Sequence, residues 1–175
     1  MTQPRQAAVL VPVYRDRNDR LRIALIRRVE RGIHAGQIAL PGGRVEAGDT
    51  SRAATALRET WEEIGVASDA VEILARLRPV RTRSSDYLIQ PFLGRIEPPA
   101  RWRPQPGEVA AVLTPTVAEL AAPGRLGRAV VQPAGWPEPR RVPCLYLDET
   151  TFVWGATYRI LRPLLVPLQA GRWPV

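Results

Sequence analysis

Several residue types and segments are missing or scarce in this 175-residue chain. It has no lysine, a single cysteine and a single histidine. Cys144 has no partner for an internal disulfide, and its apolar neighbours favour a small core residue over a catalytic thiol. No apolar run is long enough to span a bilayer, and the first residues lack the pattern of a signal peptide. We therefore expect a cytoplasmic protein with no membrane partner.

The absence of lysine leaves arginine as the only strong cation. All 25 basic residues are arginines, and with 17 acidic residues they give a formal net charge of +8 and a pI of about 11.0. The arginines are scattered rather than massed in one tail, which argues against a nucleic-acid partner and agrees with a GC-rich source. Five lie near the segments discussed below and can hold phosphates: Arg27, Arg28, Arg44, Arg81 and Arg83.

Length and composition favour one compact domain over residues 1–175. A chain of this length with 45% hydrophobic residues can bury a core of its own, and the oligomeric state stays open. Alternation and apolar runs predict strands, and turn signals separate them. The expected strands are 7–16 and 21–29 as a hairpin, 37–40, 71–80, 87–96, 108–113 and a late one at Leu145 and Tyr146. Helices are expected at 51–64, at 116–121 and at 151–168, the last interrupted at Pro163 and ended near Pro167.

The segment from Gly42 to Val66 carries the strongest chemical signal. In a helix over 51–64, Glu59, Glu62 and Glu63 stand at i, i+3 and i+4 and share a face. Clustered carboxylates repel one another unless a hard cation such as Mg²⁺ or Mn²⁺ offsets the charge. We expect Ser51 to cap this helix, Gly65 to end it, and an apolar stripe to bury the other face: Ala54, Leu57, Trp61 and Ile64.

At these residues the chain resembles the Nudix hydrolases, whose box reads G-x5-E-x7-R-E-U-x-E-E-x-G-U. Arg58 to Glu59, Glu62 to Glu63, Gly65 and Val66 match its second half. Counting from Gly43, Asp49 takes the place of the first glutamate, one extra residue precedes Arg58, and Thr60 replaces an aliphatic residue. The resemblance implies an α/β (α+β) Nudix fold, a mixed β-sheet between helices.

The flanking sequence resembles one subgroup of this family, the coenzyme A pyrophosphatases. Residues 25–43 carry a basic residue after a strand and then an H-x-G-Q turn, with Arg28, His34, Gly36 and Gln37 in the matching places. The later segment 152–157, FVWGAT, is similar as well. The resemblance implies that Arg28, His34 and Gln37 bind substrate; for His34 and Gln37 a purely local role is an equal alternative.

The family pattern also implies roles for the acidic residues. It makes Glu59, Glu62, Glu63 and the Gly43 carbonyl the metal ligands, and Arg58 a structural support that pairs with Asp49 or a box glutamate. Either a box glutamate, Glu59 or Glu62, or the downstream Glu108 acts as general base. Glu108 as an exposed strand-edge residue is the plainer alternative.

The expected activity is hydrolysis of the diphosphate of coenzyme A or a derivative to 3′,5′-ADP and 4′-phosphopantetheine, with Mg²⁺ or Mn²⁺. A second hypothesis is hydrolysis of another nucleoside diphosphate, such as ADP-ribose or an oxidised nucleotide. A third is a catalytically silent Nudix-like module that binds nucleotides or RNA. The complete set of Glu59, Glu62 and Glu63 argues against the third.

Overall fold

The computed structural model describes residues 3–32, 35–82, 86–133 and 135–175. Within these ranges the helices α1 (Arg52–Ile64), α2 (Val117–Ala121) and α3 (Gly155–Gln169) surround the strands, and a short 3₁₀ turn, η1 (Ser68–Ala70), follows α1. The strands are β1 (Arg5–Arg15), β2 (Leu21–Ile23), β3 (Leu25–Arg28), β4 (Ile38–Ala39), β5 (Gly42–Arg44), β6 (Val71–Arg76), β7 (Val80–Arg81), β8 (Tyr87–Ile96), β9 (Val109–Leu113), β10 (Leu126–Val131), β11 (Arg140–Tyr146) and β12 (Phe152–Trp154).

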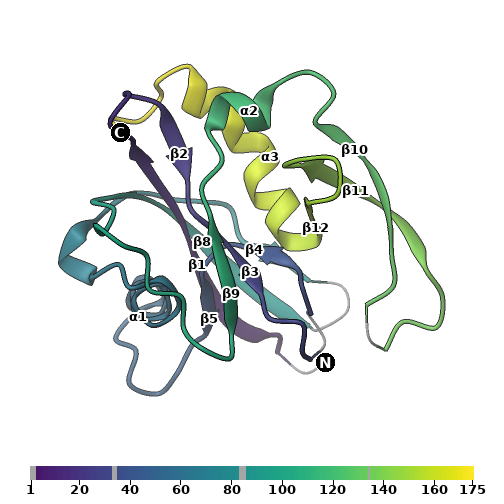
Figure 1. Cartoon of the computed structure of the whole chain (residues 1–175). Helices are drawn as coiled ribbons and strands as arrows, with labels where there is room; N and C mark the ends of the chain where they lie inside the picture. The colour runs from purple at the N-terminus through teal and green to yellow at the C-terminus, as the bar shows by residue number, and fades with distance from the viewer. Residues whose placement is uncertain (1–2, 33–34, 83–85, 134) are drawn as a thin grey trace.

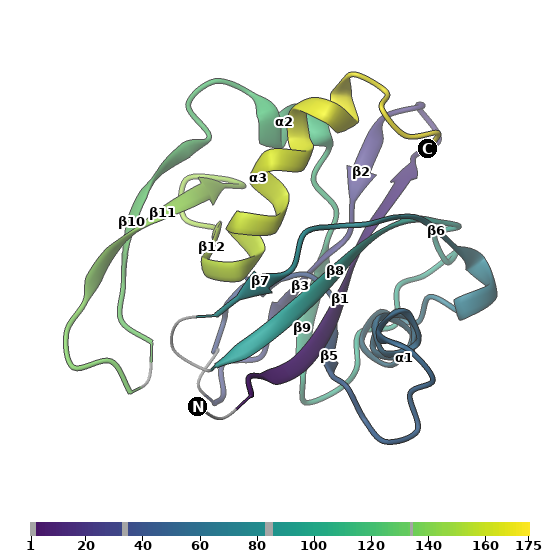
Figure 2. The ribbon, with the colours of Figure 1, turned by 180° about the vertical axis from the view of Figure 1, so that it is seen from behind.

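A mixed sheet forms the centre of the molecule, as the fold class predicted (Figures 1 and 2). β1 pairs in parallel with β8 and antiparallel with β2 and β5. β6 and β7 extend the sheet beyond β8, β3 forms a second sheet with β4 and β9, and the third contains β10, β11 and β12. A strand buried on both faces reads as a continuous apolar run, which is what β1 shows.

The two faces of β1 bury two separate cores. Val11 and Val13 pack with Leu161 and other apolar residues of α3, whereas Ala8 and Leu10 pack with Ile64 of α1. Helices therefore cover the strands on both sides, and α1 with its glutamates is held by the second core. Cys144 is buried, as its apolar context predicted.

The predicted strand 21–29 is divided between two sheets. Residues Leu21–Ile23 form the expected hairpin with β1, but Leu25–Arg28 pairs with β4 and β9 instead. The ladder ends opposite Pro12: the Ala24 N–H donates to the Pro12 carbonyl, and proline has no N–H to return the bond. After this break β3 continues in the second sheet, and Arg28 at its end lies beside Glu63 of α1.

The predicted C-terminal helix was wrong at its start and in its interruption at Pro163, whereas its end just after Pro167 is confirmed. Its first residues form β12, and the helix then runs from Gly155 through Pro163 and Pro167 to Gln169. Prolines four residues apart fall on one side of a helix, where Pro163 is exposed, while Ile160, Leu161, Leu164, Leu165 and Leu168 are buried on the other side. Packing of that face outweighs the lost backbone bonds. In the part of the chain that the structure describes, no helix combines the length and apolarity needed to cross a membrane.

Candidate active site

Helix α1 begins and ends where the sequence predicted. The Ser51 side chain accepts a hydrogen bond of 3.0 Å from the Ala54 N–H, and Gly65 ends the helix with a φ of 75°. The predicted apolar stripe was wrong at Trp61, which is 49% exposed, whereas Ile64 is buried as predicted. The buried residues of α1 are Thr55, Ala56, Thr60, Glu63 and Ile64.

Thr60 and Glu63 are polar, yet both are satisfied in this buried face. The Thr60 hydroxyl donates to the Ala56 carbonyl at 2.6 Å, which explains how threonine replaces the aliphatic residue of the family pattern. Glu63 is 2% exposed, and one of its oxygens accepts a 2.8 Å hydrogen bond from the Gly42 N–H. The helix thus places a carboxylate against the glycine strand β5.

Burial and neighbouring charge perturb Glu63 and Glu59. Burial, with repulsion from Glu59 and Glu108 as a smaller cause, raises the pKa of Glu63 to about 7, although the Gly42 N–H and Arg28 oppose the shift. Burial also raises the pKa of Glu59, which Arg58 opposes and Glu62 and Glu108 reinforce. Glu59, Glu63 and Glu108 therefore lie within electrostatic reach of one another.

Arg58 connects the helix to the preceding loop. Its Nε and Nη2 bond both oxygens of Asp49 at 3.0 and 3.1 Å, while Nη1 lies 3.1 Å from both Glu59 and Glu62. Nη2 also donates to the Arg44 carbonyl at 3.1 Å. A planar guanidinium satisfies several acceptors at fixed angles, so this residue holds the loop and two box glutamates in one arrangement.

Asp49 fixes the same loop, and its side chain is 5% exposed. It accepts bonds from the Glu46 N–H at 2.9 Å and from the Thr55 hydroxyl at 2.8 Å in addition to those from Arg58. The hydrogen bonds from Arg58 are the main reason that the pKa of Asp49 lies well below its usual range. Asp49, which takes the place of the first glutamate in the family pattern, thus pairs with Arg58.

A proline-glycine turn brings Glu108 to this site from far along the chain. The Glu108 N–H donates to the Gln105 carbonyl at 3.2 Å, and Gly107 has a φ of +88°, as a type II turn requires after Pro106. The Gln105 N–H donates to the Glu63 carbonyl at 3.0 Å, so the turn is fixed to the end of α1. The Glu108 side chain is exposed, and its own carbonyl accepts from the Val29 N–H.

Residues 25–43, which resemble the coenzyme A subgroup, contact the acidic residues of α1 through Arg28. Its Nη1 lies 3.8 Å from Glu63 Oε1, and its backbone N–H donates to the Gln37 carbonyl at 3.0 Å. Arg28 and Gln37 are therefore neighbours beside the acidic site. His34 lies outside the described residues.

No three histidine, cysteine or acidic side chains among the described residues are gathered so as to hold a metal ion as they stand. The Glu62 side chain is 44% exposed and paired with Arg58. The donors nevertheless fit a hard divalent cation in kind, since Glu59 and Glu63 are desolvated carboxylates that repel each other. The absence of a side chain at Gly43 lets the Glu59 carboxylate lie directly against the backbone of β5, where a Cβ would collide with it.

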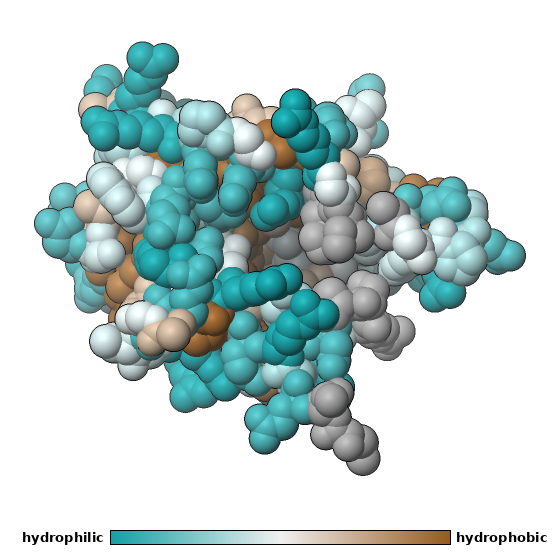
Figure 3. Space-filling model, turned by 90° about the horizontal axis from the view of Figure 1, so that it is seen from below, coloured by the Kyte–Doolittle hydropathy of each residue, from teal (hydrophilic) through white to brown (hydrophobic). Residues whose placement is uncertain are grey.

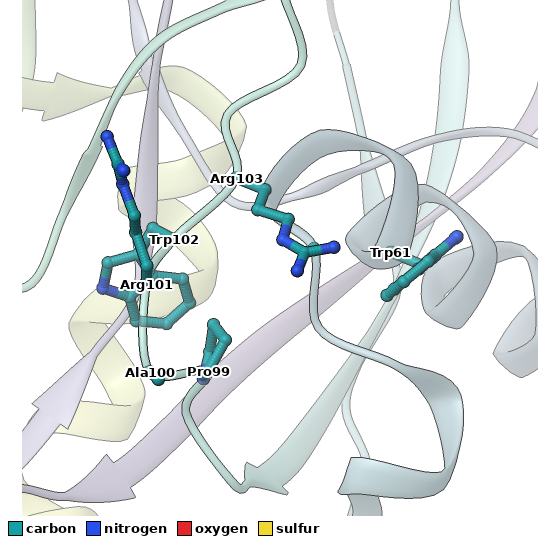
Figure 4. Close-up of a pocket in the computed structure, with 7 residues that line it drawn as sticks. Trp61, Pro99, Ala100, Arg101, Trp102 and Arg103 are labelled. Atoms are coloured by element: carbon teal, nitrogen blue, oxygen red, sulfur yellow. The ribbon is translucent and has the colours of Figure 1, made fainter.

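A cavity of about 740 Å³ lies on the outer side of α1, and no box glutamate lines it. Figure 4 shows Trp61 on α1 and, across from it, Trp102 and Arg103 of the loop between β8 and β9. That loop, 97–108, also donates from the Arg103 N–H to the Ile64 carbonyl at 3.2 Å. It therefore covers the end of α1, a role that its extended proline-rich sequence did not disclose.

The fold and this site define a diphosphate-cleaving enzyme, and the chain belongs to the NUDIX domain family, which it matches over residues 4–133. It is a Nudix hydrolase, a pyrophosphohydrolase of nucleoside diphosphate derivatives, and such enzymes generally use divalent metal ions. Nudix hydrolases named NudL and described as uncharacterized, from Salmonella newport and Salmonella enteritidis, are 39% identical over 170 residues. The match covers 97% of this chain and 85% of each relative.

Solved structures share the fold at lower identity. A MutT/nudix family protein from Enterococcus faecalis aligns with a TM-score of 0.60 and 20% identity, over 98% of this chain and 63% of that one. The NUDIX domain of Shewanella oneidensis NrtR, solved with ADP ribose, aligns with a TM-score of 0.53 and 19% identity, over 68% of this chain and 77% of that one. An Ap4A hydrolase from C. elegans aligns with a TM-score of 0.54 and 17% identity, over 66% and 82%.

Proposed function

We propose that this Nudix hydrolase cleaves the diphosphate of coenzyme A or one of its derivatives, releasing 3′,5′-ADP and 4′-phosphopantetheine. The observation that carries the proposal is the position of Arg28 and Gln37. The segment that resembles the coenzyme A subgroup folds directly against the catalytic helix, with Arg28 3.8 Å from Glu63. Arg28 and Gln37 thereby lie beside the position proposed for the substrate diphosphate.

The reaction is attack by water on one phosphorus of the diphosphate, with the other phosphate as leaving group. Glu59, Glu62, Glu63 and the Gly43 carbonyl are the proposed ligands of Mg²⁺ or Mn²⁺, which when bound neutralises phosphate charge and acidifies water. Arg58 and Asp49 are positioning residues, because the bonds from Arg58 fix Glu59 and Glu62 relative to the loop. Arg28 offers its guanidinium to the phosphate oxygens.

Glu108 is the proposed general base. Glu59 and Glu62 both accept hydrogen bonds from Arg58 and are proposed metal ligands, whereas Glu108 has no ion pair within the described part of the chain. Its exposed carboxylate lies close enough to Glu59 and Glu63 to influence both. A water held between these carboxylates can pass its proton to Glu108.

Hydrolysis of ADP-ribose or another nucleoside diphosphate is the second candidate. The complex of the related NrtR domain with ADP ribose favours it, because the two chains share a fold. ADP-ribose lacks both the pantetheine arm and the 3′-phosphate of coenzyme A. The two candidate substrates therefore differ in the 3′-phosphate, a charged group that an arginine can bind.

Steady-state kinetics on coenzyme A, dephospho-coenzyme A and ADP-ribose tests the proposal. We expect kcat/KM for coenzyme A to exceed that for dephospho-coenzyme A by about tenfold or more, with ADP-ribose lower still, since one charge-assisted contact is lost. Chromatography must identify 3′,5′-ADP as a product, and Glu63→Gln serves as the inactive control. A preference for ADP-ribose would overturn the coenzyme A assignment, and hydrolysis of none of them would favour a binding module.

A further inference from the structure

A polar groove of about 480 Å³ lies beside the catalytic site and has no assigned role. Three separate segments form it: the turn between β3 and β4, the end of β10, and the turn that leads into β12. Figure 1 shows β10 and β11 as an arm on the α3 side of the molecule, with α1 on the opposite side. The end of the molecule seen in Figure 3 is mostly hydrophilic.

Two adjacent arginines at the end of β3 serve different sides of that strand. Arg28 points to Glu63, whereas the Arg27 Nη2 lies 3.3 Å from the Thr151 hydroxyl in the groove. A β-bulge in the pairing with β9 falls at these two residues, and bulges re-aim side chains beside active sites. The groove and the glutamates therefore meet at one strand end.

Within the described ranges, no carboxylate forms an ion pair with Arg27. Among the described residues it has no acidic partner within ion-pair distance, while Arg28 and Arg58 both have one. The Arg27 side chain is half-buried, and within the described part of the chain it donates to a neutral hydroxyl, that of Thr151. A partly desolvated guanidinium with free donors binds phosphate oxygens well, and often through two bonds.

Aromatic side chains form a wall of the same groove. Phe152 and Trp154 line it, and each is held by another ring: Trp154 by Trp136 at 6.1 Å, and Phe152 by Tyr146 at 5.6 Å. Rings fixed in this way offer apolar surface to a nucleobase. The groove thus combines a cation for a phosphate with surface for a base.

We infer that this groove binds the nucleoside end of the substrate, with Arg27 contacting a phosphate monoester on the ribose and Phe152 and Trp154 contacting the base. Resting on the proposed function, the inference assigns that monoester to the 3′-phosphate of coenzyme A. The pantetheine arm carries no charge and does not need Arg27. Glu30 also lines the groove, and its negative charge opposes rather than assists the phosphate.

Calorimetry on the chelated, metal-free protein tests the groove without requiring turnover. Wild type should bind 3′,5′-ADP about tenfold or more tightly than 5′-AMP, because only the former carries the second phosphate. Arg27→Gln should reduce that ratio to near one, and Glu30→Gln should not weaken binding of 3′,5′-ADP. Arg44→Gln is the matched control, since it removes an equal charge beside Gly43 and should keep the ratio.

Kinetics then separates this inference from the proposed function. In Arg27→Gln, kcat/KM should fall about tenfold more for coenzyme A than for dephospho-coenzyme A. If wild type prefers coenzyme A and Arg27→Gln keeps that preference, the groove assignment is overturned while the proposed function stands. If wild type prefers ADP-ribose, the proposed function fails, and the calorimetric ratio still decides whether the groove binds a phosphate monoester. If only Arg44→Gln abolishes the preference for 3′,5′-ADP over 5′-AMP, the groove assignment is overturned and the 3′-phosphate binds at Arg44.

Discussion

Glu63 is a carboxylate on the buried side of its helix, and that position controls how it titrates. In the absence of metal, burial raises its pKa from 4.5 to about 7. Below the lower value both the folded and the unfolded chain hold the proton. Between the two values the unfolded chain releases it and the folded chain keeps it, so a rise in pH favours unfolding.

We therefore predict that the protein in EDTA loses stability between about pH 4.5 and pH 8, by about 3 kcal/mol at most. Glu63→Gln keeps an acceptor for the Gly42 N–H but cannot ionise, so its unfolding free energy should depend less on pH. Urea denaturation across this range measures the difference. Glu62→Gln, at a half-exposed position, should retain the wild-type dependence; the same slope in Glu63→Gln would contradict the assignment.

Arg58 acts through geometry as well as charge. Arg58→Lys keeps the charge but loses the fork that bonds Asp49, Glu59 and Glu62 together. We expect a partial loss of activity and a loss of about 1–2 kcal/mol in unfolding free energy, since Asp49 stays buried with fewer donors. Thermal denaturation should show a decrease of several degrees. Unchanged stability with activity abolished would indicate that Arg58 contacts substrate directly.

At the scale of elements, β5 and the turn at Gly107 place groups that the helix alone cannot supply. Two adjacent glycines in β5 have different reasons to lack a side chain. At Gly42, with a φ of +146°, a Cβ would collide with the Ala8 carbonyl oxygen of β1. At Gly43 the nearest atoms that it would meet belong to the Glu59 carboxylate, a side-chain end and not backbone.

The two glycines should therefore respond differently to alanine. Gly42→Ala should lower stability by about 2 kcal/mol or more, because both the backbone angle and the β1 pairing oppose it. Gly43→Ala should fold normally but lose most activity, since Glu59 must move from its place beside the glycine strand. Gly48→Ala is the control, as its Cβ would meet nothing within 4 Å. Melting temperature and kcat for the three variants give the comparison, and equal effects at Gly42 and Gly43 would contradict it.

At the scale of the whole molecule, metal binding and folding are linked through the same carboxylates. A cation that binds only the folded chain raises stability with its concentration. We expect Mg²⁺ or Mn²⁺ to raise the melting temperature of the chelated protein, and Glu59→Gln or Glu63→Gln to remove most of that increase. Both variants should lower turnover by at least ~10²-fold. Full activity in excess EDTA would refute the metal site.

The sequence by itself determined the local elements and the residue types of the site. Capping by Ser51, termination at Gly65 and the strand Tyr87–Ile96 depend on neighbours along the chain, so pattern and propensity were sufficient. The Nudix box predicted the fold class, because the spacing of its residues corresponds to one glycine turn followed by one helix. The site residues named from it stay predictions, to be tested by the substitutions above.

Only the tertiary structure decided which faces are buried and which distant segments meet. Helical spacing alone made Trp61 part of a buried stripe, yet the strands cover the Thr60 and Glu63 side and leave Trp61 exposed. Pro163 and Pro167 predicted a broken helix, but burial of the opposite face keeps α3 continuous. The contacts of Arg27 with Thr151 and of Gln105 with the end of α1 join residues far apart in sequence. Such contacts depend on how the elements pack together, and a local sequence pattern carries no information about that packing.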